Sequence, residues 1–358
     1  VSQRFARSAL ARAIACVAIA PPSPDLTVPP ALLERAFGPG VEVVAVHDAN
    51  GGRGVFSRVL RVTLAWPTTS HRTPGRPDTV VVKVPVAGPN GEAARAAGAY
   101  RREALAYTDV LPTSPVATPR VHLVTTDDRG GADLVLEDLG ALRAVDQLDG
   151  LAPADAVAVA TALRDFHRHW RERPELAQLD VRRTTPAVLD PGALAQGLVA
   201  LRQRWDHDDI RPWWPTFDRL VERRSALVAR FAAAGRPTLC HGDPRADNLV
   251  FGTDGSPVLF DWQQLAVQVG EADLAWLAAT SLTVDDRRRL DDTLVEAYGG
   301  TTDHYRVGLV LPGLAVLLLA QRQLDDERAE RFVATSLARI GAAVTDLDVP
   351  GLADGAVW

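Results

Sequence analysis

Three polar residues in the second half of the chain have the types and spacing that phosphoryl transfer requires. Asp243 stands in the stretch "HGDPRADN", Asn248 follows five positions later, and Asp261 comes thirteen positions after Asn248, behind the apolar run "PVLF". Transfer of a phosphoryl group from a nucleotide needs a carboxylate that orients the attacking hydroxyl and two oxygen ligands for a divalent metal ion. We therefore predict Asp243 as the catalytic base, and Asn248 and Asp261 as ligands of Mg²⁺.

The same chemistry needs a cation for the phosphates that are not transferred, and the chain has one lysine. Lys83 lies in the apolar run "DTVVVKVPV", whereas every other basic residue is an arginine. An ammonium is a compact point charge that can reach phosphate oxygens from within a strand, while a guanidinium is planar and forked. We predict that Lys83 binds the phosphates of ATP. The alternative is a lysine on an edge strand without a function.

A lysine with this role needs a carboxylate from a neighbouring helix. Glu103, in "YRREALAY", lies twenty residues downstream of Lys83 and is the candidate, with Glu92 as a rival. The helix that carries Glu103 must therefore pack beside the strand that carries Lys83. This pair would hold the ammonium in place for the phosphates.

Two further segments have the composition of a nucleotide site. The stretch "NGGRGVFS" joins two predicted strands, and Gly52 and Gly54 would let its backbone approach the phosphates while Ser57 adds a hydroxyl. In "LEDLG", we predict that the backbone of Glu137 and Leu139 bonds the edge of adenine. These five residues complete the predicted ATP site.

The elements around these residues change character along the chain. The first part alternates β-branched and polar residues, which predicts five mostly antiparallel strands with one helix at 91–111 after the third strand. The strands are expected at 41–49, 55–66 and 78–86, with two more around the "DDRGG" turn in 119–140. Helical periodicity follows, broken by a β-rich island at 238–263. Helices are expected at 153–170, 191–205, 215–234, 284–298 and 305–345.

This pattern predicts an α+β fold of two lobes. We expect an extension at 1–24, a small sheet lobe at 25–136 that binds the nucleotide, a hinge at 137–140, and a helical lobe at 141–358 that carries the catalytic loop and the substrate site. The apolar run 307–320 is too short to span a membrane and contains a proline, so we predict a buried core helix there. No membrane contact is expected.

Charge and cysteine content exclude other classes of protein. The net charge is −6, and no basic tail or stripe occurs, so a nucleic-acid partner is not expected. The two cysteines lie far apart and form no metal-ligand cluster. Residues 1–24 resemble a weak signal peptide, but we favour an amphipathic tail or an upstream start read as Val1, since the predicted chemistry needs cytosolic ATP. Because the predicted chemistry uses ATP, we expect a cytoplasmic protein with no obligate protein partner.

The order of these motifs resembles the aminoglycoside phosphotransferase and choline kinase superfamily, a branch of the protein-kinase-like fold. His241 before Gly242–Asp243, and "FDWQ" where protein kinases have DFG, favour this branch, and "GEADLAWLAATSL" looks most like its bacterial ecdysteroid-kinase-like (CHK-like) subgroup. The resemblance covers roughly 25–348 and is firmest at 238–282. It implies a bilobal kinase-like fold, the roles given above for each site residue, and an Asp273 that braces the catalytic loop.

The chain departs from this family in two places. "GGRGVFS" is not a regular GxGxxG loop, and the acidic clusters that hold polycationic sugars are not evident near the C-terminus, the densest acidic stretch being "RWDHDD" at 204–209. We predict an enzyme that transfers the γ-phosphate of ATP to a hydroxyl of a small molecule. The alternatives are a pseudokinase that binds nucleotide as an interaction module, and a protein kinase, which the "HGD" and "DWQ" variants disfavour.

Overall fold

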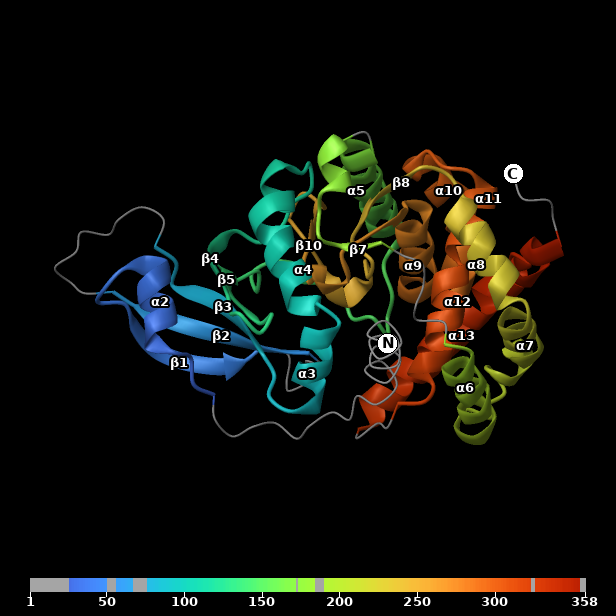
Figure 1. Ribbon diagram of the computed structural model, residues 1–358, viewed down its shortest axis with the longest axis horizontal. Helices are drawn as coiled ribbons and strands as arrows, with labels where there is room; N and C mark the ends of the chain where they lie inside the picture. The colour runs from blue at the N-terminus through green and yellow to red at the C-terminus, as the bar shows by residue number, and fades with distance from the viewer. Residues whose placement is uncertain are drawn as a thin grey trace.

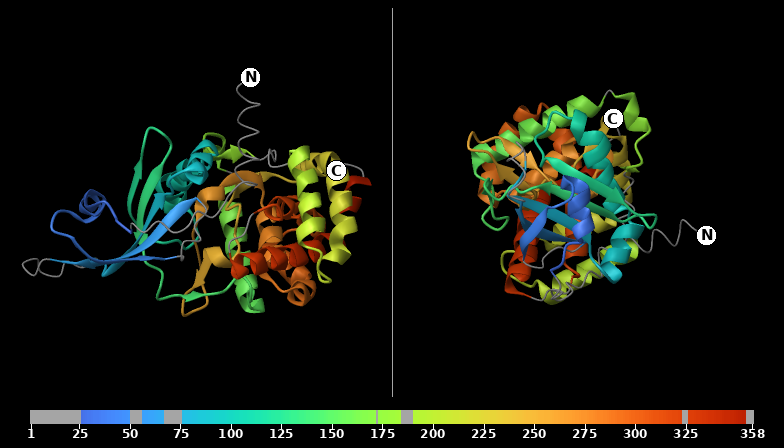
Figure 2. Two further views of the ribbon diagram at one scale, coloured as in Figure 1. Left: turned by 90° about the horizontal axis from the view of Figure 1, so that it is seen from below. Right: turned by 90° about the vertical axis from the view of Figure 1, so that its left-hand side faces the viewer.

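The protein was studied as a computed structural model, which describes residues 26–49, 56–66, 76–171, 173–183, 190–322 and 326–354. Within these residues an antiparallel sheet lies at one end and a larger, mainly helical part lies at the other (Figures 1 and 2). We call them the sheet lobe and the helical lobe. This arrangement confirms the predicted α+β fold. The predicted extension 1–24 lies outside the described residues, and the predicted lobe boundaries stay predictions.

The sheet lobe contains five strands in the order β1-β2-β3-β5-β4, and every neighbouring pair is antiparallel. The alternation of β-branched residues creates one buried face, on which Leu60, Val62, Val80, Val82 and Val135 form a core. The strands are β1 Glu42–Asp48, β2 Ser57–Ala65, β3 Thr79–Pro85, β4 Val121–Thr126 and β5 Ala132–Glu137. Since β3 is in the middle of this sheet, Lys83 is not an edge-strand lysine, and that alternative is wrong.

The helix predicted at 91–111 is interrupted. It consists of α3 Pro89–Ala96, α4 Ala99–Leu105 and a π-helical turn at Ala106–Val110. Gly98, between α3 and α4, has φ of +70°, a conformation that glycine adopts without strain. The sheet lobe has another helix, α2 Pro30–Phe37, which was not predicted because it follows directly on a proline-rich segment.

The helical lobe packs around one large apolar core. Figures 1 and 2 show its helices, in which α9 lies at the centre and contacts both α12 and α13. The predicted helices at 215–234 and 305–345 are each divided. The bounds are α5 Pro153–Arg171, α6 Pro191–Arg204, α7 Trp214–Glu222, α8 Arg224–Ala233, α9 Glu271–Ser281, α10 Val284–Tyr298, α11 Thr302–Gly308, α12 Val310–Leu319 and α13 Glu327–Asp346.

Short strands form the β-rich island. β9 and β10 make a hairpin that β6 extends, while β8 pairs with β11, which also pairs with β7. Residues 241–248, the catalytic loop, connect β8 to β9 and so lie where the two small sheets meet. The strands are β6 Arg143–Ala144, β7 Arg182–Arg183, β8 Pro237–Cys240, β9 Leu249–Phe251, β10 Pro257–Leu259 and β11 Ala266–Val269.

One described stretch has the length and composition of a membrane span. It is Thr302–Leu319, with 18 residues and a mean hydropathy of 1.2, and it comprises α11 and α12. In the structure 61% of it is buried against the rest of the protein. A mostly buried helix of this kind is typical of a core, as predicted for 307–320.

Candidate active site

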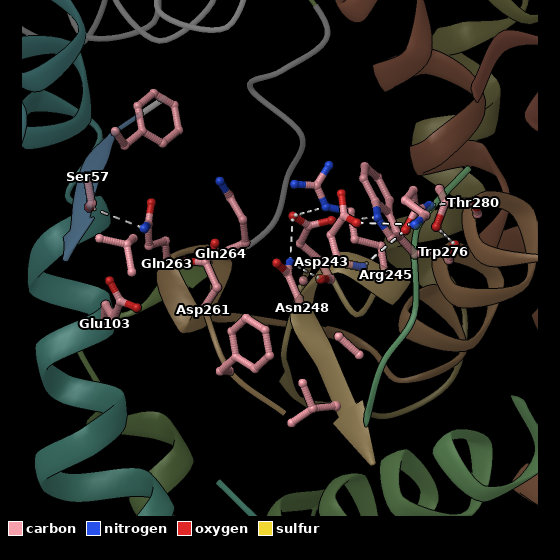
Figure 3. A pocket seen from close by; sticks show the side chains of 18 of the residues that line it. Ser57, Glu103, Asp243, Arg245, Asn248, Asp261, Gln263, Gln264, Trp276 and Thr280 are labelled. Atoms are coloured by element: carbon pink, nitrogen blue, oxygen red, sulfur yellow. Dashed lines mark hydrogen bonds and ion pairs between the residues drawn. The ribbon is translucent and has the colours of Figure 1, made fainter. Parts of the chain in front are cut away.

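A cavity of about 890 Å³ is lined by residues of both lobes. Every predicted site residue that the structure describes is on its wall, and Figure 3 shows many of them in one view. Gly52 and Gly54 fall outside the described residues. The lining residues predicted from the sequence are Ser57, Lys83, Glu103, Glu137, Leu139, Asp243, Asn248 and Asp261.

Lys83 links the sheet lobe to the segment that follows β10. Its ammonium Nζ lies 2.7 Å from Oε1 of Glu103 on α4 and 2.8 Å from Oδ1 of Asp261 after β10. The lysine residue is 7% exposed, because β3 is covered on both sides. Glu103, rather than its rival Glu92, is the helix carboxylate that reaches the lysine.

Two carboxylates share this one ammonium, and burial alters all three pKa values. Burial alone would lower the pKa of Lys83, but Asp261 and Glu103 outweigh it, so that pKa is raised. Burial raises the pKa of Glu103 to about 7, against the opposing effect of Lys83. Burial also disfavours ionised Asp261, yet Lys83 holds the pKa of Asp261 below its ordinary value. Lys83 and Asp261 are therefore charged at neutral pH.

Asp243 is held in place by donors on two sides. Nε1 of Trp276 donates to its Oδ1 at 2.8 Å, and Nδ2 of Asn248 donates to its Oδ2 at 3.2 Å and to its main-chain oxygen at 2.8 Å. Because Asn248 uses its amide nitrogen for these bonds, its amide oxygen can serve as a metal ligand. Burial raises the pKa of Asp243. A carboxylate fixed in this way can accept a hydrogen bond from the hydroxyl group of a molecule bound in the cavity.

Asp261 has an unusual backbone conformation. Its φ is +63°, in the left-handed region that few residues other than glycine adopt. The segment that follows is tied to the sheet lobe, since Nε of Arg102 on α4 donates to the main-chain oxygen of Gln263 at 2.9 Å. Nε2 of Gln263 also lies 3.5 Å from Oγ of Ser57, a long contact that Figure 3 draws. Backbone strain of this kind concentrates at functional sites, where the surroundings enforce it.

Asp273 braces the catalytic loop, as predicted. Its carboxylate accepts from the main-chain N–H groups of His241 at 2.7 Å and Gly242 at 2.9 Å, and it lies 3.1 Å from Nε2 of His167 on α5. Both Asp273 and His167 are at most 1% exposed. A buried carboxylate that accepts two backbone bonds fixes the start of the loop that carries Asp243.

Substitution of Asp273 by Asn will lower the free energy of unfolding by about 2–3 kcal/mol. An amide has one acceptor oxygen, so its NH₂ group would face one of the two backbone N–H groups and leave that donor unpaired. Urea denaturation measures the change. Asp285→Asn, at an exposed ion pair with Arg288, is the matched control. Equal losses in the two variants would contradict the bracing role.

Gly242 is required at its position by both backbone and space. Its φ is +85°, and a Cβ there would lie 2.3 Å from the main-chain oxygen of Gln264. Gly255 has a similar φ of +82° but nothing within 4 Å of its added Cβ. An alanine at either position would have a strained backbone, but at Gly242 it would also collide with Gln264. A comparison of the two alanine variants therefore isolates the cost of the steric conflict.

Gly242→Ala will consequently cost about 1–3 kcal/mol more stability than Gly255→Ala. It will also lower turnover, because relief of the conflict displaces the neighbouring Asp243. Urea unfolding and a phosphoryl-transfer assay on both variants test this. If the two alanine variants behave alike, the close approach of the catalytic loop to Gln264 does not constrain the site.

The segment predicted as the hinge also lines the cavity. The main-chain N–H of Glu137 donates to the main-chain oxygen of Arg120 at 2.8 Å, and the main-chain oxygen of Leu139 accepts from the N–H of Leu142 at 2.9 Å. The carboxylate of Asp138 holds the turn by accepting from Gly140 N–H at 2.9 Å. Glu137 and Leu139 both line the cavity, so the backbone of this segment lies where a nucleotide base could be bound.

Some residues of the site were not predicted. Trp276 follows Asp273 by three residues, so the two lie on one face of α9, but a tryptophan in an apolar helix also fits a core position. Arg245 lies two residues after Asp243, and its Nε is 3.6 Å from Oδ2 of Asp243. An arginine in a chain rich in arginine gives no signal of its own.

Comparison with solved structures supports a kinase-like fold. The complex of APH(2")-IIia with GDP and kanamycin is similar over 88% of this chain and 98% of its own, with 13% identity and a TM-score of 0.55. A choline/ethanolamine kinase family protein from Mesorhizobium loti matches over 99% of this chain and 100% of its own, with 16% identity and a TM-score of 0.50. At such identities the likeness concerns the fold.

The sequence also matches the model of a protein family. A model of the phosphotransferase enzyme family, APH, matches residues 64–310, and the chain belongs to this family. A search of the curated proteins finds no match. The protein is thus a phosphotransferase of the kinase type, in the aminoglycoside phosphotransferase and choline kinase superfamily. The closer resemblance to the ecdysteroid-kinase-like subgroup stays a prediction.

Proposed function

We propose that the protein transfers the γ-phosphate of ATP to a hydroxyl group of a small molecule, with Mg²⁺ as cofactor. The convergence of Lys83, Asp261, Asn248 and Asp243 on one cavity carries this proposal. These residues come from β3, the catalytic loop and the end of β10, which are far apart in the sequence. A structural ion pair would not require the additional acid and amide beside it.

Asp243 acts on the acceptor in this proposal. Its carboxylate accepts the hydroxyl proton while the acceptor oxygen forms a bond to the γ-phosphorus. The bond from that phosphorus to the oxygen bridging it to the β-phosphate breaks, and ADP leaves. Trp276 and Asn248 keep the carboxylate in one orientation, so little reorganisation is needed when the hydroxyl arrives.

Lys83 binds the phosphates that stay on the nucleotide, and Glu103 positions it. Ser57 adds a hydroxyl on the same wall, and the backbone of Glu137 and Leu139 meets the base. Asn248 and Asp261 would hold Mg²⁺, which neutralises charge on the phosphates when bound. The donor set fits this ion, since it consists of oxygen atoms with an excess of negative charge over the one ammonium.

Known structures of the same fold are consistent with nucleotide use. The GDP complex of wild-type aminoglycoside 2'-phosphotransferase-IIIa matches 88% of this chain and 97% of its own, with 14% identity and a TM-score of 0.52. The complex of APH(2")-IIia with GDP and kanamycin, a small molecule, supports a small-molecule acceptor here, and we propose that no nucleic-acid or obligate protein partner takes part. We further propose a cytoplasmic location, where ATP is available.

The test is ADP release from Mg·ATP, and from Mg·GTP in parallel, across a panel of aminoglycosides, macrolides, amino alcohols and sterols. Release that depends on one acceptor and is lost in Asp243→Asn would support the proposal. Saturable Mg·ATP binding without transfer to any hydroxyl would favour a pseudokinase. Transfer to serine in a protein mixture would favour a protein kinase.

A further inference from the structure

The helical lobe supplies one wall of the cavity through α12 and α13. Arg245, two residues after Asp243, lies over the ring of Phe332 on α13 at 5.3 Å from its centre. Trp276, which bonds Asp243, lines the cavity beside this wall. A molecule whose hydroxyl reaches Asp243 must therefore place the rest of its body against α12 and α13.

This wall is apolar. On each helix, residues four positions apart line the cavity, and this is the spacing of one helix face. The hydroxyl of Ser336 donates to the main-chain oxygen of Phe332 at 2.8 Å, so it is satisfied within the helix. The six residues are Leu311, Ala315 and Leu319 on α12, and Phe332, Ser336 and Ile340 on α13.

Three arginines lie near this wall. Arg245, Arg322 and Arg328 line the cavity, and Arg328 is paired with Asp146 at 2.7 Å. Burial alone would lower the pKa of Arg245, but Asp243, Asp247 and Asp261 outweigh it, so the charge of this arginine is offset. The acidic stretch at 204–209 does not line the cavity, and its Asp206 pairs with Arg211.

Arg245 and Arg328 each have an acid nearby, whereas Arg322 forms no ion pair with an acid in the described part of the chain. Its Nε is buried and has no hydrogen-bond partner in the described part of the chain. Burial, together with the neighbouring charge of Arg245, lowers the pKa of Arg322. A largely buried guanidinium with an unpaired Nε beside an apolar wall favours an anion, because an anion would bond that nitrogen and offset both the burial and the repulsion by Arg245.

We propose that the acceptor is an alcohol with an apolar body and one anionic group, a carboxylate or a phosphate, which Arg322 binds. This inference rests on the proposed function and adds the acceptor class to it. A polycationic acceptor on this wall would bring positive charge next to Arg322, which has no ion pair with a described acid to offset it. The apolar body would lie on the faces of α12 and α13, and its hydroxyl would lie at Asp243.

The test uses sets of three acceptors that share one skeleton and one primary hydroxyl. Each set has a carboxylic acid, its methyl ester and the corresponding amine, on linear, aromatic and steroid skeletons, and a fourth member with a phosphate monoester separates the two anions. kcat/KM for ADP release is measured with the wild type, Arg322→Gln and Arg322→Lys. Arg331→Gln, on the exposed side of α13, is the matched control.

We expect the anionic member of at least one set to exceed its ester, and the ester to exceed the amine. Arg322→Gln should reduce the preference for anion over ester by about 10- to 100-fold, Arg322→Lys should restore part of it, and Arg331→Gln should not change it. A preference for the amine, a preference for anion that survives Arg322→Gln, or no turnover of any set while Mg·ATP binds would overturn the acceptor class. Absence of Mg·ATP binding would instead overturn the proposed function.

Discussion

Replacement of Asp243 by Asn will lower kcat by about 10²- to 10⁴-fold and will leave the Kd for Mg·ATP within about a factor of three of the wild-type value. The amide retains the size of the side chain and can still meet Trp276. It cannot accept the proton of an attacking hydroxyl. The loss should therefore fall on the chemical step, as measured by ADP release at saturating nucleotide and by calorimetric titration with Mg·ATP.

The matched control for this variant is Asp254→Asn. Asp254 lies in the turn of the β9–β10 hairpin, a few residues from the same catalytic segment, and it accepts hydrogen bonds from Ser256 near the surface. It loses the same charge and should keep full activity. If Asp243→Asn turned over at the rate of Asp254→Asn, Asp243 could not be the base. If nucleotide affinity fell together with kcat, Asp243 would belong to the nucleotide site.

Sequence patterns predicted the lobes because each pattern has a distinct period. Alternating β-branched residues indicated the strands β1 to β5, and helical periodicity located the larger lobe. Breaks within helices were missed, because a break such as the one at Gly98 depends on a single residue in a long alanine-rich stretch. α2 was missed because proline-rich sequence indicates a linker until the chain is seen to fold on the sheet.

The polar centre of the site was accessible from sequence because its residues are rare or closely spaced. Lys83 is unique in composition, and Asp243 and Asn248 share one short motif. Trp276 and Arg322 were not accessible, since their types also occur in cores and on surfaces. Their roles depend on distance from Asp243 and on burial without a partner, which only the folded chain reveals. Acceptor recognition is encoded by packing and has no motif.

Lys83→Arg will lower kcat/KM for Mg·ATP by about 10²-fold although it preserves the charge. Nζ lies 2.7 Å from Oε1 of Glu103 and 2.8 Å from Oδ1 of Asp261, so one compact ammonium bonds both carboxylates from a central strand. We expect a longer, planar guanidinium to displace α4 or Asp261, and displacement of Asp261 moves a proposed metal ligand. Steady-state kinetics over a range of Mg·ATP concentrations measure the effect, and an unchanged KM for ATP would contradict a phosphate-binding role.

Lys83→Met separates the role of this lysine in folding from its role in binding. Loss of the ammonium leaves the buried Glu103 next to the partly exposed Asp261 with no counter-charge, which should cost about 3–5 kcal/mol of stability. Lys83→Arg keeps a counter-charge for both and should cost only about 1–3 kcal/mol, the usual penalty of overpacking. If nucleotide binding depends on the compact ammonium itself, both variants lose affinity for Mg·ATP while only Lys83→Met loses most of its resistance to urea. Parallel losses of affinity and stability in the two variants would mean that the lysine serves mainly to hold the lobes together.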